Sequence, residues 1–185
     1  ILMNQSYIKK GTAIDKLLKS LIVTEIDYDD LIVGDKNAIM VAARVLGYGP
    51  DYTFEYEGEE HTVDLGQLEN KSIDDSNFTQ GLNEFPYTLP YSKMGITYKL
   101  LTNKDEKNIT RELEGLKRLN KESSAELSTR LKFMITSVDG DRDISTIRKF
   151  VDKRLLARDS KTLRKHIKNS QPDVDLTFFS WKRRL

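Results

Sequence analysis

The first apolar pattern along the chain has the three- and four-residue spacing of one face of an α-helix. It predicts an amphipathic helix over residues 12–22, whose stripe consists of Ile14, Leu17, Leu18, Leu21 and Ile22. A second helix is expected to begin at residues 34–35 and to end at Gly47 and Gly49, because glycine often terminates helices. Its expected stripe is Ile39, Ala42, Ala43 and Leu46. The chain therefore opens with two helices whose apolar faces need a partner surface.

A different periodicity follows, in which alternate residues are polar as in a half-exposed β-strand. Residues 52–56 and 61–65 have this alternation, and residues 57–59 between them predict a turn. We therefore expect a β-hairpin. From residue 66 to residue 90 the chain contains polar and turn-forming residues with scattered aromatics, which predict an extended connector.

The second half of the chain begins with a predicted strand over residues 96–101 and a predicted helix over residues 103–119. Thr102 and Asp105 have the spacing of a capping box at the start of that helix, with Asp in place of the usual Glu or Gln. Its expected inward positions are Ile109, Leu113 and Leu116.

Three further helical segments are predicted beyond residue 120. Ser123 or Ser124 can cap the first of them. The positions expected to share a face are Leu127, Leu131, Met134 and Ile135 in the first segment, Ile144, Ile147, Val151 and Leu155 in the second, and Leu163 and Ile167 in the third. A turn is expected over residues 138–141, and residues 173–179 can add a last strand.

Together these elements predict an α+β fold that is predominantly helical. We expect N-terminal helices with a small β-hairpin over residues 1–66, an extended connector over residues 67–95, and a strand with a C-terminal helical bundle over residues 96–185. A chain of 185 residues is long enough for one or two packed units. Its apolar runs are shorter than the roughly 20 residues that a membrane helix needs, so no membrane partner is expected.

Charge is distributed unevenly along the chain. Residues 1–70 carry 6 Lys/Arg against 13 Asp/Glu, a net −7, whereas residues 71–185 carry 24 against 16, a net +8. Such asymmetry is typical of surfaces that steer partners, including identical copies stacked head to tail, and is equally common where it has no role. The chain has no cysteine, which excludes disulfides and thiolate zinc sites and fits a reducing cytoplasm.

The sequence does not support an enzyme. Gly-Lys-Ser/Thr never occurs, so no phosphate-binding loop is present, and nucleophile elbows are also missing. His61 and His166 lie far apart without ligand spacing, and we interpret both as surface or strand residues. The aspartates at 139, 141 and 143 alternate as in a calcium loop, but Phe150 stands where that loop needs a bidentate glutamate, so an ordinary acidic turn is favoured. We expect no catalytic, cofactor or metal site.

Two basic features remain. Residues 147–168 hold nine basic side chains, Arg154, Arg158 and Arg164 among them, which is enough for a phosphate-binding face. Phe150 is the one aromatic residue there and its spacing places it in the core, so a solvated or protein-facing basic helix is favoured over nucleic acid. Arg44 lies among small and apolar residues, so its guanidinium either extends to solvent or meets a carboxylate such as that of Asp35 or Asp51, and we favour the ion pair.

Several short motifs occur in order along the chain. They are Gly34-Asp35, Ala42-Ala43-Arg44, Gly47-Tyr48-Gly49-x-x-Tyr52, Asn83-Glu-Phe-x-Tyr-x-Leu-Pro90, Leu100-Leu-Thr102-x-x-x-Glu106, Thr129-Arg-Leu131, Ser137-Val-Asp-Gly140 and Pro172-Asp-x-Asp175. In order and spacing they resemble the baseplate hub assembly proteins of T-even-like contractile-tailed bacteriophages. The resemblance covers most of the chain. Relatives often carry cysteine pairs that suggest zinc ribbons, and this chain has none, so metal binding is not implied.

The resemblance implies a non-enzymatic protein of tail morphogenesis, located in the baseplate of the virion tail or in the host cytoplasm during assembly. Its implied partners are other baseplate or tail proteins, or a second copy of the chain. The motif residues expected to have a structural role are Gly34, Asp35, Arg44, Gly47, Tyr48, Gly49 and Tyr52. As contacts for a partner we select Phe85, Tyr87, Tyr91, Arg154, Arg158 and Arg164. Two alternatives stay open: the connector aromatics pack onto their own domain, and the basic helices form a nucleic-acid-binding module.

Overall fold

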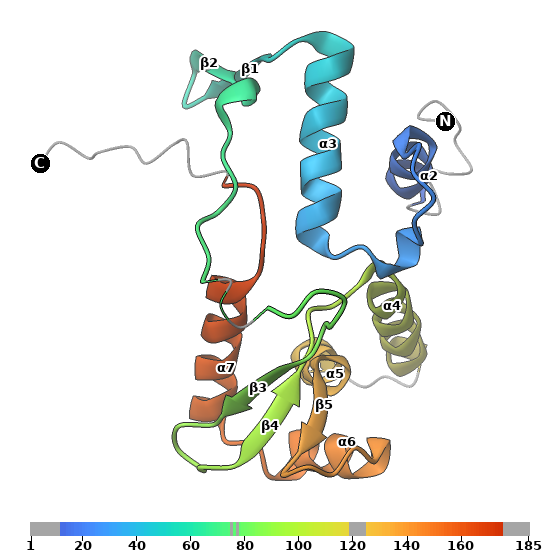
Figure 1. Ribbon diagram of the computed structural model, residues 1–185, viewed down its shortest axis with the longest axis vertical. Helices are drawn as coiled ribbons and strands as arrows, with labels where there is room; N and C mark the ends of the chain where they lie inside the picture. The colour runs from blue at the N-terminus through green and yellow to red at the C-terminus, as the bar shows by residue number, and fades with distance from the viewer. Residues whose placement is uncertain (1–11, 75, 77, 119–124, 176–185) are drawn as a thin grey trace, which may run out of the picture. The chain divides into compact units, whose positions relative to one another are not determined.

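The computed structural model describes residues 12–74, 76, 78–118 and 125–175 (Figure 1). The predicted α+β class with an N-terminal β-hairpin is confirmed. The chain divides into two compact units: unit 1 comprises residues 1–72 and 172–185, and unit 2 comprises residues 73–171. These boundaries differ from the expected ones at 66/67 and 95/96, because the predicted connector contains a strand, residues 85–88, that pairs within unit 2.

Unit 1 begins with the two predicted helices, α2 (Ala13–Leu21) and α3 (Val33–Tyr48). A short 3-10 turn, η1 (Tyr28–Asp30), lies between them in the sequence. Gly49 follows α3 with a φ of 84°, a value that glycine adopts without strain, and so ends the helix where the sequence predicts.

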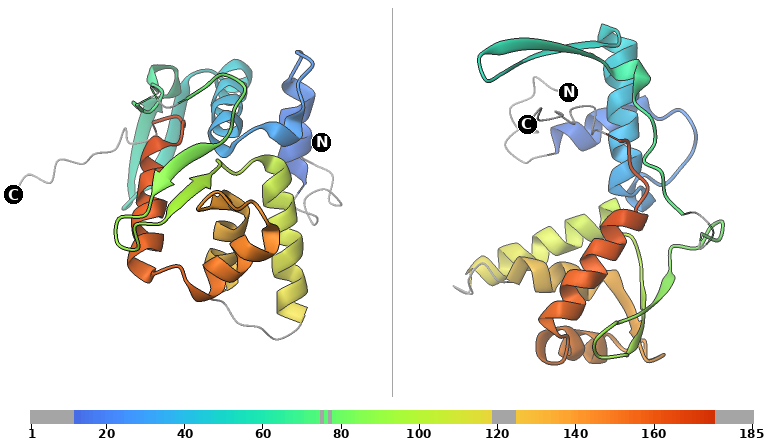
Figure 2. Two further views of the ribbon diagram at one scale, coloured as in Figure 1. Left: turned by 60° about the horizontal axis from the view of Figure 1, so that its bottom comes forward. Right: turned by 90° about the vertical axis from the view of Figure 1, so that its left-hand side faces the viewer.

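The predicted hairpin is formed by β1 (Asp51–Tyr56) and β2 (Glu59–Asp64), which are antiparallel with Tyr52 opposite Val63. Figure 2 shows it as a two-stranded ribbon that projects from the end of α3. A second 3-10 turn, η2 (Leu65–Gln67), follows it. Beyond η2, Asn70 forms an isolated bridge with Val174. This bridge is the described part of the predicted last strand; residues 176–179 lie outside the described residues.

The buried centre of unit 1 is small and partly polar. Its buried apolar residues are Ala13, Leu18 and Tyr28 among the described positions. The Tyr28 hydroxyl donates to Asp15 Oδ1 at 2.8 Å, and the Lys36 ammonium pairs with the same oxygen at 2.7 Å. Burial, together with this hydrogen bond to a carboxylate, raises the pKa of Tyr28.

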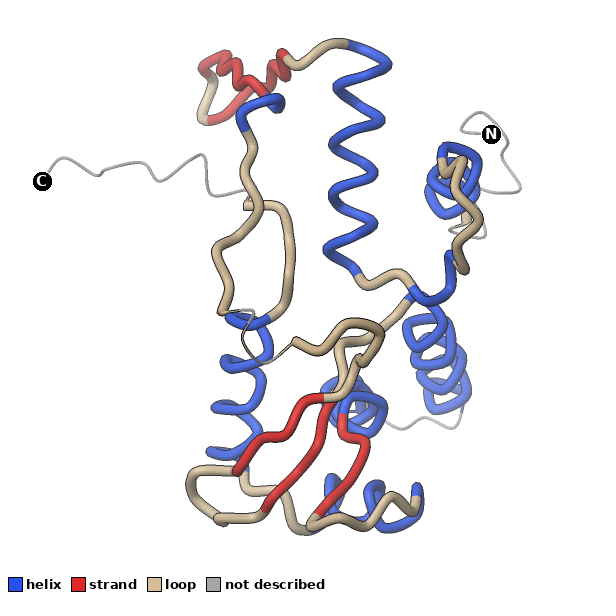
Figure 3. Tube along the Cα trace, viewed as in Figure 1, coloured by secondary structure: helices blue, strands red, loops and turns tan. Residues whose placement is uncertain are grey.

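Unit 2 contains a three-stranded antiparallel sheet in the order β3–β4–β5, formed by β3 (Phe85–Thr88), β4 (Gly95–Tyr98) and β5 (Ile135–Val138). Its helices are α4 (Asn103–Arg118), α5 (Ala125–Met134), α6 (Ile144–Lys153) and α7 (Ala157–Ser170). Figure 3 shows the three strands of the sheet side by side, and in Figures 1 and 2 α5 and α7 lie on one side of it.

The structure corrects the predicted helix face that includes Ile135. The helix α5 ends at Met134, and Ile135 begins β5 opposite Tyr98 of β4. Ile, Thr and Val have branched Cβ atoms, which favour strands over helices, and pairing with β4 then fixes residues 135–138 as a strand. The strand predicted over residues 96–101 is correspondingly shorter and ends at Tyr98.

The capping box at the start of α4 is confirmed. The Asp105 backbone N–H donates to the Thr102 hydroxyl at 3.4 Å, and the Thr102 backbone N–H donates to the Asp105 carboxylate at 3.1 Å. Arg118 is the last described residue of this helix. The caps expected at Ser123 or Ser124 lie outside the described residues.

The core of unit 2 is large for its length. It contains fourteen of the seventeen buried apolar residues that the structure describes, with Leu89, Phe150 and Leu163 among the most enclosed. Phe150 is therefore a core residue, as its spacing predicts. Salt bridges join the surrounding helices, since Arg130 of α5 pairs with Glu106 of α4 at 2.8 Å. Within the described residues of both units, no helix is long and apolar enough to cross a membrane.

Candidate protein-interaction surfaces

Arg44 organises the end of α3. Its guanidinium donates to the backbone carbonyl oxygens of Gly49 at 3.0 Å and Asp51 at 3.1 Å. It also lies over the rings of Tyr48 and Tyr52, 5.0 and 5.8 Å from their centroids. Arg44 thereby ties the helix to the first strand of the hairpin.

The predicted ion pair of Arg44 with a carboxylate is wrong, because its guanidinium donates to backbone carbonyls instead. Asp51 offers Arg44 its backbone carbonyl instead of its carboxylate. Asp35 lies nine residues earlier on the same helix, about 13 Å along the axis. Its carboxylate accepts the Ile32 backbone N–H at 3.1 Å and stabilises the start of α3.

Gly34 has a packing role that the sequence alone does not reveal. A Cβ atom at this position would lie 2.1 Å from the carbonyl oxygen of Pro172, so no other residue fits without movement. The same contact region includes Asn37, whose amide donates to Asp173 at 3.0 Å. By contrast, a Cβ atom at Gly47 would meet nothing within 4 Å.

The C-terminal end of α3 exposes large apolar side chains. Leu46 is 88% exposed and Tyr48 is 81% exposed, although the helical stripe predicts that Leu46 points inward. Tyr52 and Tyr56 of β1 are also exposed. Leu46 lies two residues before Tyr48 and therefore on another side of the helix. We call Tyr48, Tyr52 and Tyr56 the α3–hairpin patch. Sequence periodicity misplaced Leu46 because it identifies an apolar face without saying whether a partner element covers it.

The two faces of the hairpin differ in chemistry. Tyr52, Phe54 and Tyr56 alternate along β1 and therefore share one face, where the Phe54 ring lies 5.9 Å from Tyr52 and 5.8 Å from His61. On the opposite face the Thr53 and Thr62 hydroxyls are hydrogen bonded at 2.9 Å. Acidic residues surround this threonine pair, namely Asp51, Glu55, Glu60 and Asp64. The hairpin thus presents an aromatic face and an acidic face.

The predicted contacts in the connector separate into buried and exposed residues. Phe85 is only 6% exposed, and its ring packs 5.0 Å from Phe78 and 5.5 Å from Tyr98. Tyr87 is half-buried and stacks on His166 at 4.5 Å. Phe85 and Tyr87 therefore pack onto their own unit, which is the alternative that the sequence left open.

Tyr91 is different, because its side chain is 54% exposed and the Arg158 guanidinium lies 5.8 Å from its ring centroid. The structure thus brings together two residues that the sequence selected independently. The Tyr91 and Ser92 backbone N–H groups donate to the buried carboxylate of Asp159 at 2.9 and 3.0 Å. Asp159 thereby fixes the loop that carries Tyr91.

His166 is not the surface or strand residue that the sequence suggested. It lies on α7, is half-buried, and its Nε2 atom is 3.0 Å from the Tyr98 hydroxyl. Burial lowers the pKa of His166, which favours the neutral imidazole at pH 7. The ring forms one wall of a pocket of about 180 Å³ with Phe78, Phe85 and Tyr87. His166 has no neighbours in the sequence at a recognisable motif spacing, so the sequence did not predict this cluster.

The basic run on α6 and α7 is partly structural. Arg148 forms two hydrogen bonds with the Glu112 carboxylate, at 2.8 and 2.7 Å, which lower the pKa of Glu112. Arg154, Arg158 and Arg164 are exposed. The other exposed members of the run are Lys149, Lys153, Lys161, Lys165 and Lys168.

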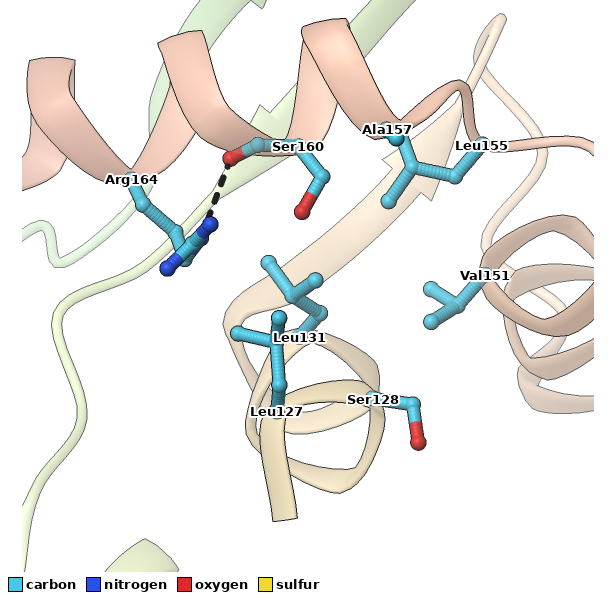
Figure 4. A pocket seen from close by; sticks show the side chains of 8 residues that line it. All are labelled: Leu127, Ser128, Leu131, Val151, Leu155, Ala157, Ser160 and Arg164. Carbon is cyan, nitrogen blue, oxygen red and sulfur yellow. Dashed lines mark hydrogen bonds between the residues drawn. The ribbon is translucent and has the colours of Figure 1, made fainter. Parts of the chain in front are cut away.

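An apolar groove lies between α5, α6 and α7, with a volume of about 280 Å³ (Figure 4). Its lining residues are Leu127, Ser128, Leu131, Val151, Leu155, Ala157, Ser160 and Arg164. Arg164 stands at one edge, where its Nε donates to the Ser160 carbonyl oxygen at 3.3 Å. Helical spacing revealed the apolar residues of this groove but not that they leave a space between three helices.

The three alternating aspartates are part of a turn and a helix cap. Asp139 accepts the Gly95 backbone N–H at 2.9 Å, and Asp141 accepts that of Asp143 at 2.8 Å. Asp143 caps α6 by accepting the Thr146 backbone N–H at 2.8 Å. Across the described ranges, no group of three or more His, Cys, Asp or Glu side chains has the arrangement of a metal site.

The chain was compared with protein-family models, with curated proteins and with solved structures, and none of them matches it.

Proposed function

We propose that the protein is a non-enzymatic phage tail protein, a component or assembly factor of the baseplate hub, which acts through protein–protein contacts. The ordered motifs from Gly34 to Asp175 support the phage assignment by resemblance. The observation that carries the contact function is the exposure of the α3–hairpin patch, which consists of Tyr48, Tyr52 and Tyr56.

The chemistry of this patch fits a protein partner. Tyrosine is enriched in protein interfaces because its ring provides apolar area and its hydroxyl a hydrogen bond. Arg44 holds Tyr48 and Tyr52 in place, so less conformational freedom is lost when a partner binds. A two-stranded hairpin is also only marginally stable by itself, and a partner that covers its aromatic face would stabilise it.

The patch can be tested in cells infected with the phage that encodes the chain. An affinity-tagged chain is purified during infection, and copurifying proteins are quantified by mass spectrometry. Replacing Tyr48 with Asp should remove the copurifying baseplate proteins, whereas Leu82→Asp, at an exposed position of unit 2, should retain them. Equal recovery with both variants would contradict the role of the patch.

The location of the protein needs a separate measurement. Quantitative mass spectrometry of purified virions and of infected-cell lysates distinguishes a hub subunit, which is present at fixed stoichiometry in the particle, from an assembly chaperone, which is found only in lysate. Absence from both would contradict the phage-tail assignment.

A second candidate function is nucleic-acid binding, and the observation that favours it is the exposure of Arg154, Arg158 and Arg164. Binding by these residues should weaken steeply as salt is added, because each neutralised phosphate releases counterions. Fluorescence anisotropy with labelled DNA and RNA at low salt tests this candidate, and absence of binding there would remove it.

A further inference from the structure

The groove between α5, α6 and α7 of unit 2 has the features expected of a binding site for an apolar side chain that is flanked by acidic residues. Leu127, Val151 and Leu155 are only partly buried at its surface, and Leu131 forms its buried floor. An apolar centre with a charged rim is the usual arrangement of an interface hot spot.

The rim of this groove is positive. Arg164 lines the groove, and Lys161 lies on the same helix between the lining residues Ser160 and Arg164. Of the acidic groups nearest in sequence to the lining residues, Asp152 pairs with Lys132 at 2.7 Å and Glu126 pairs with Arg130 at 3.4 Å. The third, Asp159, is buried and accepts two backbone N–H groups. The exposed charge that remains at the groove favours an acidic ligand.

Unit 1 contains a segment with the complementary chemistry. Residues 22–27 connect α2 to η1 without belonging to a helix or strand. Val23 in this segment is 100% exposed and Ile26 is also exposed, while Glu25 and Asp27 provide negative charge beside them. A fully exposed valine that is followed by Glu25 and Asp27 gains by burial in an apolar groove with a positive rim.

We propose that the groove between α5, α6 and α7 binds residues 22–27 of a second copy of this chain. Val23 occupies the apolar centre, and Glu25 faces Arg164 at the rim. This inference goes beyond the proposed function, because it rests on a different surface and does not depend on a role in phage assembly.

The segment has a suitable length for this contact. An extended chain advances about 3.3 to 3.6 Å per residue, so Val23 and Glu25 are separated by about 7 Å, which is similar to the edge of a cube with the groove's volume of about 280 Å³. Because groove and segment are different surfaces, the contact is head-to-tail. Such contacts close into rings or continue as filaments, depending on the rotation between copies.

The full-length chain should self-associate in sedimentation velocity experiments, and the association should weaken with added salt. Val23→Asp should weaken it at least about ten-fold, because a charge would enter the apolar groove. The control is Ile144→Asp, which changes an exposed apolar residue of α6 that does not line the groove and should leave the association unchanged.

Charge-reversal variants provide the decisive test of the proposed contact. Arg164→Glu and Glu25→Lys should each weaken self-association by about ten-fold, since each places like charges together. Mixing the two variants should restore association, because the acidic groove of one then meets the basic segment of the other. Recovery in the mixture also shows that both variants are folded.

Three results would overturn the proposal: a monomer at all concentrations, association that Val23→Asp leaves intact, or no recovery in the mixture. Fluorescence anisotropy with labelled nucleic acid tests whether the rim binds nucleic acid instead. Tight binding that Arg164→Glu removes, with the protein itself monomeric, would assign the rim to nucleic acid instead. None of these results affects the test of the α3–hairpin patch, which uses Tyr48.

Discussion

Unit 1 and unit 2 place their apolar residues in opposite ways. Among the described residues, unit 2 buries fourteen apolar side chains around its sheet, whereas unit 1 buries three and exposes Leu46 and Tyr48 almost completely. The described residues of unit 2 therefore include the core of a self-sufficient domain, whereas those of unit 1 do not. The difference shows that apolar spacing along a helix does not reveal whether the rest of the chain covers those side chains.

The largest effect on stability is expected from a substitution in the core of unit 2. Phe150→Ala should lower the free energy of unfolding by about 3 to 5 kcal/mol, because it removes a fully buried aromatic ring. Leu46→Ala in unit 1 should change it by less than about 0.5 kcal/mol. Urea denaturation followed by circular dichroism measures both. Similar losses for the two variants would show that Leu46 is buried and would remove the contrast between the units.

The next effect concerns the buried carboxylate of unit 2. Asp159→Ala should destabilise the protein by about 2 to 3 kcal/mol, because two part-buried backbone N–H groups lose a charged acceptor. Asp159→Asn, which keeps one acceptor oxygen, should be milder. Thermal denaturation of both variants checks this order, and a milder Ala variant would contradict it.

Asp159 also predicts a dependence of stability on pH. Burial alone raises the pKa of this carboxyl, but the hydrogen bonds from Tyr91 and Ser92 outweigh burial and the pKa lies below its usual range. Its stabilisation is therefore complete above the unfolded pKa of about 3.9 and is lost as the pH falls through the lower folded value. Asp159→Ala should have a shallower acid decline of unfolding free energy than the wild type. If the unfolding free energy of Asp159→Ala declined in acid as steeply as that of the wild type, Asp159 would not be the cause of the decline.

Substitutions at two glycines of α3 test how this helix packs within unit 1. Gly34→Ala should destabilise unit 1 by about 1 to 3 kcal/mol, because the new methyl group would overlap the Pro172 carbonyl. Gly47→Ala, on the same helix with open space around it, should be neutral or stabilising by up to about 1 kcal/mol. Circular dichroism melts compare the two. A reversed order would mean that residue 172 does not approach α3.

The smallest effect is expected at Arg44. Arg44→Lys should cost about 1 kcal/mol or less, because an ammonium does not reproduce the planar guanidinium that reaches two carbonyls and two rings. Arg111→Lys, an exposed Arg on α4, is the control. Equal stability of the two variants would indicate that the Arg44 contacts add little.

Local sequence signals predicted most elements of the fold. Helical spacing located α3 and α7, and the period-two pattern located the hairpin, because these patterns depend on neighbours within one element. The same reasoning failed at Ile135, where pairing with β4 decides between helix and strand. Its apolar spacing from Leu131 continues the pattern of α5 and conceals the change.

The candidate surfaces were less predictable. As contacts, sequence reasoning selected Tyr91 and Arg158, which are exposed, but it also selected Phe85, which is buried. Tyr48 is exposed as well, although the sequence suggested only a structural role for it. Composition cannot distinguish an aromatic anchor for a partner from one that packs on its own sheet. The groove and the His166 cluster require residues from separate elements, so only the folded chain brings them together.

The contrast between the units is tested most directly by hydrogen–deuterium exchange of the full-length chain, measured by mass spectrometry at neutral pH. We predict slow exchange in β4, β5 and α7, at rates near those of global unfolding, and exchange in α3 and the β1–β2 hairpin that is at least about a hundred-fold faster through local opening. Equal protection of the two units would contradict the claim that the described residues of unit 1 form no self-sufficient core.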